Sequence, residues 1–129
     1  MKNVNVQTLK VTEKKFFRLW ITLLQPFLKL SEQELNILAY LLYYRHIILK
    51  EVKNKSIVND LLFNTKTRNK IKEDLNIPGY SFNNKLTSLR KKGLIVDNVL
   101  NQKIIPVIED DFTNFKLVYD VNIIKEKQQ

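Results

Sequence analysis

The chain has 129 residues, enough for one domain with a hydrophobic core and too few for two domains of ordinary size. It contains no cysteine and one histidine, which excludes disulfides and thiolate metal sites and makes a zinc site a poor candidate. The formal net charge is +9, and the basic excess is concentrated between residues 53 and 92, where 10 basic side chains accompany 3 acidic ones. Such a concentration is typical of a surface that meets phosphate.

The first 29 residues are expected to form a short strand and an apolar helix. Valines alternate with polar neighbours over residues 4–8, which predicts the strand. Thr12 then caps a helix over EKKFFRLWITLLQ, and Pro26 is expected to end it or to begin a short linking turn. This helix either covers the core or contacts a partner through Trp20 and its aromatic neighbours.

The clearest helix start lies in LSEQEL. Ser31 and Glu34 form a capping box there, and the leucines on either side of it form a hydrophobic staple. A helix from Glu32 to about Ile47 is therefore expected, with His46 at its end or at the edge of the core.

A short inserted helix and a longer one are expected next. Ser56 is placed as a cap before a group of apolar residues, which predicts the short helix. Thr65 or Thr67 then begins the helix RNKIKEDL, in which Ile71 and Leu75 face inward.

The sequence LNIPGY predicts a tight turn before another helix. Pro78 disfavours helical geometry at the residue before it, and the new helix is expected to start near Ser81. Three cationic residues followed by Gly93 predict its end. The helix would bury one apolar stripe, made of Phe82, Leu86 and Leu89.

The remainder of the chain predicts strands. The segment LIVDNVLNQKIIPVIEDD is expected to form a hairpin with its turn between Asn98 and Gln102. The acidic run at residues 109–111 is expected to be a solvated loop, and the alternative is that it keeps nucleic acid off that edge or meets a basic partner. From Phe115 to Ile123 apolar residues alternate with polar ones, which predicts a C-terminal strand. It would pair with the hairpin, with the N-terminal strand or with another subunit.

Residues 67–95, TRNKIKEDLNIPGYSFNNKLTSLRKKGLI, resemble the core of the winged helix-turn-helix DNA-binding superfamily. The resemblance implies an α+β fold, with a three-helix core and a β-hairpin wing over residues 30–108. Residues 1–29 and 109–129 would then be extensions of the same domain, so that an N-terminal helix, an inserted helix and a C-terminal strand are added to the core. It also implies that the helix at residues 81–92 lies in the major groove and that the hairpin touches the DNA backbone or the minor groove.

The helical repeat adds candidate contacts to this implied interface. With Phe82, Leu86 and Leu89 inward, Lys85 and Arg90 flank the stripe near phosphates. The residues expected to face a groove are Asn84, Thr87, Ser88 and Lys91. A single arginine in the helix favours A·T-rich or weakly specific binding of double-stranded DNA. The candidate DNA-binding residues are Lys66, Arg68, Lys70, Tyr80, Ser81, Asn84, Lys85, Thr87, Ser88, Arg90, Lys91 and Lys103.

The leading functional hypothesis is a DNA-binding transcription regulator or a phage or plasmid replication factor. The alternative is a winged helix that serves as a protein interaction or assembly module without binding DNA. A homodimer or a protein partner would contact the N-terminal helix or the C-terminal strand. Catalytic and metal-binding motifs are not recognised, so neither an enzyme nor a cofactor is expected. The sequence has neither an apolar run of ~20 residues nor a signal peptide, so no membrane contact is expected. A cytoplasmic location in a bacterial or infected host cell is expected instead.

Overall fold

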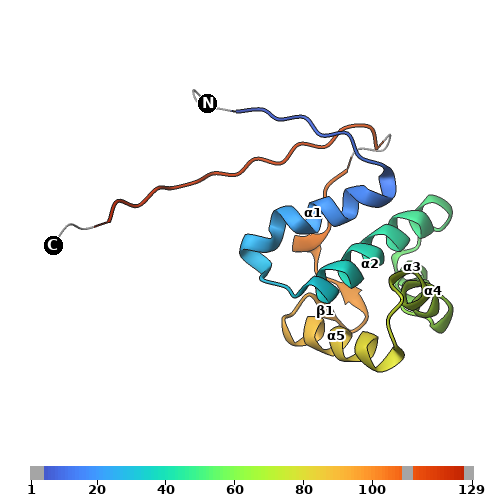
Figure 1. Ribbon diagram of the computed structural model, residues 1–129. Helices are drawn as coiled ribbons and strands as arrows, with labels where there is room; N and C mark the ends of the chain where they lie inside the picture. Colours follow the sequence, from blue (N-terminus) through green and yellow to red (C-terminus); the bar gives the residue numbers. More distant parts are fainter. Residues whose placement is uncertain (1–4, 109–111, 127–129) are drawn as a thin grey trace.

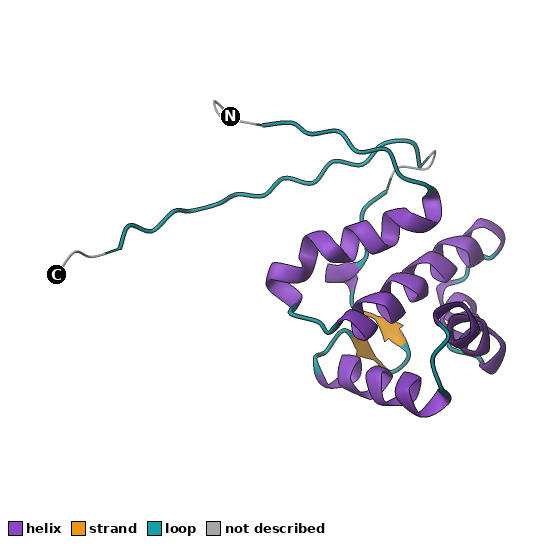
Figure 2. Cartoon of the chain, in the orientation of Figure 1, coloured by secondary structure: helices purple, strands orange, loops and turns teal. Residues whose placement is uncertain are grey.

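The computed structural model describes residues 5–108 and 112–126, and Figure 1 shows their course. The described residues form five α-helices, one antiparallel pair of strands and one 3-10 helix, so the fold is mostly helical and compatible with the α+β class (Figure 2). The elements are α1 (Glu13–Leu28), α2 (Glu32–Glu51), α3 (Lys55–Leu62), α4 (Thr65–Leu75), α5 (Gly79–Lys91), β1 (Ile95–Val96), β2 (Val99–Leu100) and η1 (Gln102–Ile104).

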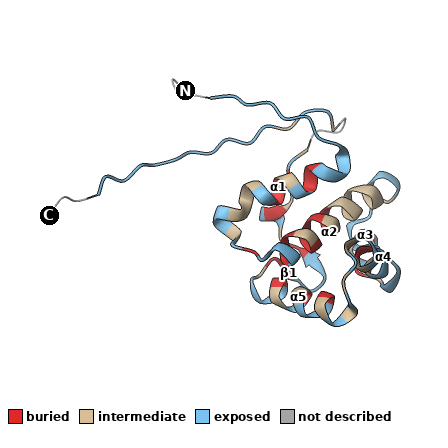
Figure 3. Ribbon diagram, viewed as in Figure 1, coloured by how far each residue is buried: buried red, intermediate tan, exposed pale blue. Residues whose placement is uncertain are grey.

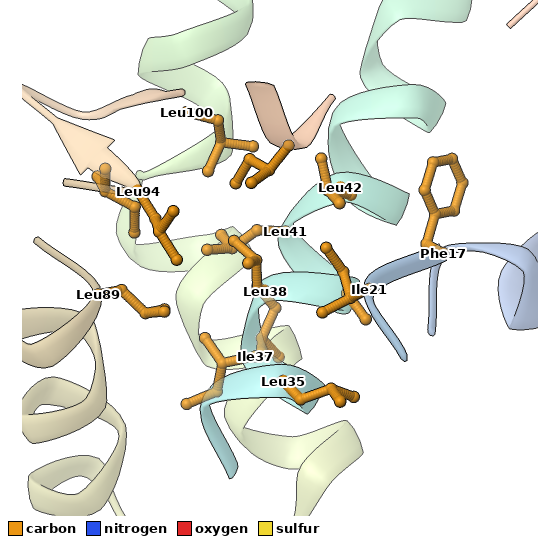
Figure 4. Close-up of a cluster of buried hydrophobic side chains, with 14 of the residues drawn as sticks. Phe17, Ile21, Leu35, Ile37, Leu38, Leu41, Leu42, Leu89, Leu94 and Leu100 are labelled. Atoms are coloured by element: carbon orange, nitrogen blue, oxygen red, sulfur yellow. The ribbon is translucent and has the colours of Figure 1, made fainter. Parts of the chain in front are cut away.

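Helix α2 is the centre of the molecule. It contacts α1, α3, α4 and α5, and it lies between α1 and α5 in Figure 1. Its buried residues point to more than one side, and Figure 4 shows Leu38 and Leu41 between Ile21 of α1 and Leu89 of α5. One hydrophobic cluster therefore joins the first helix, the middle helices and the hairpin.

The predicted start of α2 is confirmed. Ser31 accepts a hydrogen bond from the Glu34 backbone, and the Glu34 side chain accepts one from the Ser31 backbone, while both staple leucines are buried. The helix continues to Glu51, beyond the expected end near Ile47, because no Gly or Pro interrupts it. His46 lies half-buried near that end, with Nε2 2.7 Å from Glu13 Oε1 at the start of α1.

Helix α1 begins at the predicted Thr12 cap, but the expectation that Pro26 ends it was wrong. Pro26 lies in the last turn, where the missing N–H costs a single intrahelical bond and the helix runs on to Leu28. The turn that follows is held from within the helix. The Gln25 side chain donates to the Leu30 carbonyl at 2.7 Å and accepts from the Leu30 N–H at 2.8 Å.

Helices α3 and α4 were predicted with the wrong caps. Asn54, and not Ser56, caps α3, since its side chain accepts from two backbone N–H groups. Asn64, and not Thr65 or Thr67, caps α4. Asparagine ranks above threonine as an N-cap, and each asparagine immediately precedes the first helical residue.

The end of α5 matches its prediction. Gly93 has φ +75°, its N–H binds the Arg90 carbonyl, and the Leu94 N–H binds the Leu89 carbonyl at 3.0 Å. These two bonds form a Schellman motif, in which the left-handed residue lets the chain reverse into β1.

Gly93→Ala should lower the free energy of unfolding by about 1 kcal/mol, because an L-residue is strained at this positive φ. A Cβ there would meet no atom within 4 Å, so the cost lies in the backbone alone. Gly79→Ala is the matched control, since its Cβ would meet only the Lys72 Nζ at 3.9 Å. Urea unfolding followed by circular dichroism measures both, and equal stabilities would contradict the prediction.

The predicted hairpin exists, but its turn was misplaced. Asp97 and Asn98 have φ of 51° and 57°, as in a two-residue turn of type I′, and Val96 pairs with Val99. The segment that was expected to form the turn continues instead into η1, where Ile104 is buried. The Trp20 indole donates a hydrogen bond to the Ile104 carbonyl at 2.8 Å and so ties η1 to α1.

Both predicted terminal strands were wrong. Residues 5–12 and 112–126 carry no strand, although both are extended (Figure 1), and Val4 lies outside the described residues. A strand needs a neighbour, and the sheet of the described chain consists of two-residue strands that pair only with each other. The acidic run at 109–111 also lies outside the described residues.

Candidate nucleic-acid interface

Helices α4 and α5 are joined by a three-residue turn. Asn76 adopts the left-handed conformation at φ 52°, and its N–H bonds to the last carbonyls of α4. Pro78 then occupies the N-cap of α5, so this helix begins at Gly79, two residues before the predicted Ser81. The predicted stripe is confirmed, since Phe82, Leu86 and Leu89 are buried.

The opposite side of α5 is exposed. Asn84, Thr87 and Lys91 are all exposed there, and Tyr80 in the first turn retains 72 % of its surface. Helix α1 lies on the other side of α2 (Figure 1), so it does not cover this face. The Thr87 hydroxyl donates to the Asn83 carbonyl at 3.0 Å, which leaves its oxygen as an acceptor. We call Tyr80, Asn84, Thr87 and Lys91 the outer face of α5.

The expectation that Ser88 points into a groove was wrong. Its hydroxyl donates to Glu34 Oε2 at 2.6 Å, because the first turn of α2 packs against this flank of α5. Ser81 and Lys85 are half-buried on the helix as well. The helical repeat places Ser88 at the margin of the outer face, where the packing of α2 decides its direction.

Glu34 holds α5 to α2. The carboxylate is buried, with 3 % exposure, and besides Ser88 it accepts hydrogen bonds from the Ser31 N–H at 2.8 Å and from Lys92 Nζ at 2.9 Å. Burial raises the pKa of Glu34, but the hydrogen bonds from Ser88, Ser31 and Lys92 outweigh it and lower this pKa to about 2. The sequence indicated only the cap, because a capping-box glutamate carries no sign that it is also buried.

The other flank of α5 faces the hairpin. Arg90 Nη2 donates to Asn98 Oδ1 at 3.4 Å between two exposed side chains. The hairpin tip carries Asp97 and no cation. Lys103, predicted as the one cation of the wing, lies exposed on η1 after the hairpin. This hairpin therefore offers little attraction for phosphate.

The predicted cations of α4 differ in their exposure to solvent. Lys66 and Lys70 are exposed, whereas Arg68 is half-buried and its Nε has no hydrogen-bond partner. Lys72, which was not predicted as a contact, has its Nζ 5.9 Å from the centre of the Phe82 ring. Together with Lys91, the exposed lysines of α4 place positive charge on both helices of the α4–α5 pair.

Comparison of the chain with protein-family models, with curated proteins and with solved structures finds no match. None of the described helices combines the length and the apolar character needed to cross a bilayer. Among the residues that the structure describes, no group of three or more histidine, aspartate or glutamate side chains is placed to hold a metal ion.

Proposed function

We propose that the chain is a DNA-binding winged helix protein that acts in transcription regulation or in phage or plasmid replication. In this proposal α2, α4 and α5 form the three-helix core, β1 and β2 form the wing, and α1 and α3 are additions. The observation that carries it is the exposed outer face of α5, which is polar, carries Lys91 and has no acidic residue.

The exposed lysines of α4 and α5 suit a polyanion. Lys66, Lys70 and Lys91 are exposed, and each lysine that neutralises a phosphate releases a bound counterion from DNA. Asn84 adds an amide that can pair with both the N6 and N7 groups of adenine in the major groove. Tyr80 and Arg90 would lie near the backbone at the two ends of α5. The hairpin would contribute little, so most of the affinity would come from the helices.

The A·T preference is part of the proposal. The outer face offers an asparagine and a lysine for base edges, while the only arginine of α5 flanks that face and donates a hydrogen bond to Asn98 on the hairpin. Arginine is the residue that most often reads guanine, so a G·C-rich site would gain less from this helix.

The experiment measures fluorescence anisotropy of labelled A·T-rich and G·C-rich duplexes over a range of salt concentrations. Lys91→Ala should weaken binding to both duplexes alike and reduce the slope of log K against log salt by about 1. Asn84→Ala should instead cost about 1–3 kcal/mol on the preferred duplex and less on the other. The first variant tests contact with phosphate, and the second tests reading of bases.

Lys15→Ala is the matched control, because it removes the same charge from an exposed position on α1, across α2 from α5. It should leave the affinity and the salt slope nearly unchanged. Binding that Lys15→Ala weakens as much as Lys91→Ala would contradict the placement of DNA on α5. Absence of binding at low salt would contradict the function itself.

An assembly module is the second candidate, and one observation favours it. Large apolar side chains are exposed on both extended terminal segments, for instance Val6 at 75 % and Val121 at 72 %. Exposed apolar rows mark sites of protein contact. Under this function the duplexes above would not bind, whereas a protein partner would cover the terminal segments.

A further inference from the structure

The extended C-terminal arm, residues 112–126, has an anchored half and a free half. In the anchored half, the centre of the Phe115 ring lies 5.3 Å from that of Trp20 and 5.1 Å from that of Phe16. The Tyr119 ring stacks on Phe27, with 6.2 Å between the ring centres. Beyond Tyr119 the apolar side chains lose such contacts, and Ile123 is 87 % exposed. Figure 3 shows the arm exposed along most of its length as it leaves the helices.

Such an arm has the properties of an unpaired edge strand. Its odd-numbered residues from Phe115 to Ile123 are apolar, which is the alternation of a strand with one buried face. Residues 115–123 of the arm belong to no strand pair of the described chain, and the ribbon considered below uses these residues. An extended apolar segment with free backbone groups is a template for pairing with another chain.

We propose that this partner is the same arm of a second copy, and that the two arms form an antiparallel ribbon centred on Val118. In this register Lys116 lies opposite Asp120 of the second copy, and Leu117 lies opposite Tyr119. Cross-strand pairs of opposite charge and of aromatic with aliphatic residues both stabilise a ribbon.

Other registers lose these pairs. A parallel in-register ribbon would place Lys116 beside Lys116 of the second copy. Antiparallel ribbons centred on residue 116 or 120 would oppose like charges, and those centred on 117 or 119 would separate Lys116 from Asp120. A shift by one residue along one strand would put apolar side chains opposite polar ones. The charges and the alternation therefore select the centre at Val118.

The same register joins the free half of each arm to the anchored half of the other. Val121 would lie beside Phe115 of the second copy, on the face of the ribbon that packs against Trp20. Residues that are exposed in one chain would thus be covered by the aromatic cluster of the other. The inference does not rest on DNA binding, because it involves no residue of the outer face of α5.

Cysteine cross-linking in the full chain tests the register, since the chain has no cysteine of its own. Val118→Cys places two thiols about 5 Å apart across the two-fold axis, within reach of a short bismaleimide. Ile124→Cys is the matched control, because its residue is 89 % exposed and its two copies would lie about 40 Å apart. Efficient linkage at 118 and little at 124 is expected, and equal yields would overturn the proposal.

A charge exchange measured by sedimentation equilibrium gives a second test. Lys116→Asp and Asp120→Lys each place like charges opposite one another in both symmetry-related pairs and should raise the dimer Kd by roughly threefold to thirtyfold. The double variant restores opposite charges and should return the Kd close to that of the unmodified chain. A double variant as weak as the single ones, or an unmodified chain that stays monomeric at every concentration, would overturn the proposal.

Discussion

Glu34→Gln should lower the free energy of unfolding at neutral pH by about 3 kcal/mol. The substitution keeps the shape of the side chain but removes the negative charge that Lys92 and Ser88 bind at 2.9 Å and 2.6 Å. The carboxylate is buried, and charged hydrogen bonds in such a place are among the strongest that a side chain makes. Urea unfolding, followed by the fluorescence of the single tryptophan, measures the change.

The pH dependence separates this charge effect from a packing defect. Because the pKa of Glu34 is lowered from 4.5 to about 2 on folding, its contribution is complete above pH 4.5 and is lost as the pH falls toward 2. The difference in the free energy of unfolding between the unmodified protein and the glutamine variant should therefore vanish as the pH falls over that range. A difference in the free energy of unfolding that stays constant down to pH 2 would show that the loss of the charge does not cause the destabilisation.

Glu32→Gln provides the control for Glu34. It lies two residues earlier in the same first turn, but its side chain is 82 % exposed and its nearest cation, Arg18, is 4.0 Å away. An exposed ion pair of this kind contributes little, so the change should stay within about 0.5 kcal/mol.

Trp20→Ala should lower the free energy of unfolding by about 4 kcal/mol. The side chain is buried, its ring packs against Phe115, and its N–H satisfies the Ile104 carbonyl at 2.8 Å. Its removal leaves a large cavity between α1 and η1 and a buried carbonyl without a donor. Circular dichroism during urea unfolding is the measurement, since the variant has no other tryptophan.

Two further variants divide the effect of Trp20. Trp20→Phe keeps most of the ring and loses the donor, so it should cost about 1–3 kcal/mol. Phe27→Ala removes an aromatic residue of the same helix that is 70 % exposed, and it should change the stability by less than about 1 kcal/mol. A phenylalanine variant as stable as the unmodified protein would show that the hydrogen bond to Ile104 contributes nothing.

Features set by neighbouring residues were predictable from the sequence. The box at Ser31, the stripe of α5 and its end at Gly93 each depend on residues within about two helical turns, where spacing alone fixes the geometry. The inserted helix α3 was also predicted from a local pattern, although its cap was assigned to Ser56 and not to Asn54.

Features that depend on distant contacts were not predictable. Alternation over residues 115–123 shows that the arm suits a sheet, but not whether its own chain supplies a neighbouring strand. Ser88 belongs to the exposed side of an isolated helix, and only the packing of Glu34 against it, 54 residues away in the chain, turns it inward. The twelve residues predicted to bind DNA include that serine, and contact of any of them with DNA stays a prediction.

The position of α2 between α1 and α5 has a consequence for how the two proposed contacts combine (Figure 1). Because the C-terminal arm lies along α1, a ribbon formed there would leave the outer face of α5 unobstructed in each copy. The dimer would then carry two DNA-binding faces. Binding of one face to its half-site would raise the effective concentration of the other face at the neighbouring half-site. A duplex with two half-sites would therefore be half-saturated at a lower protein concentration than a duplex with one.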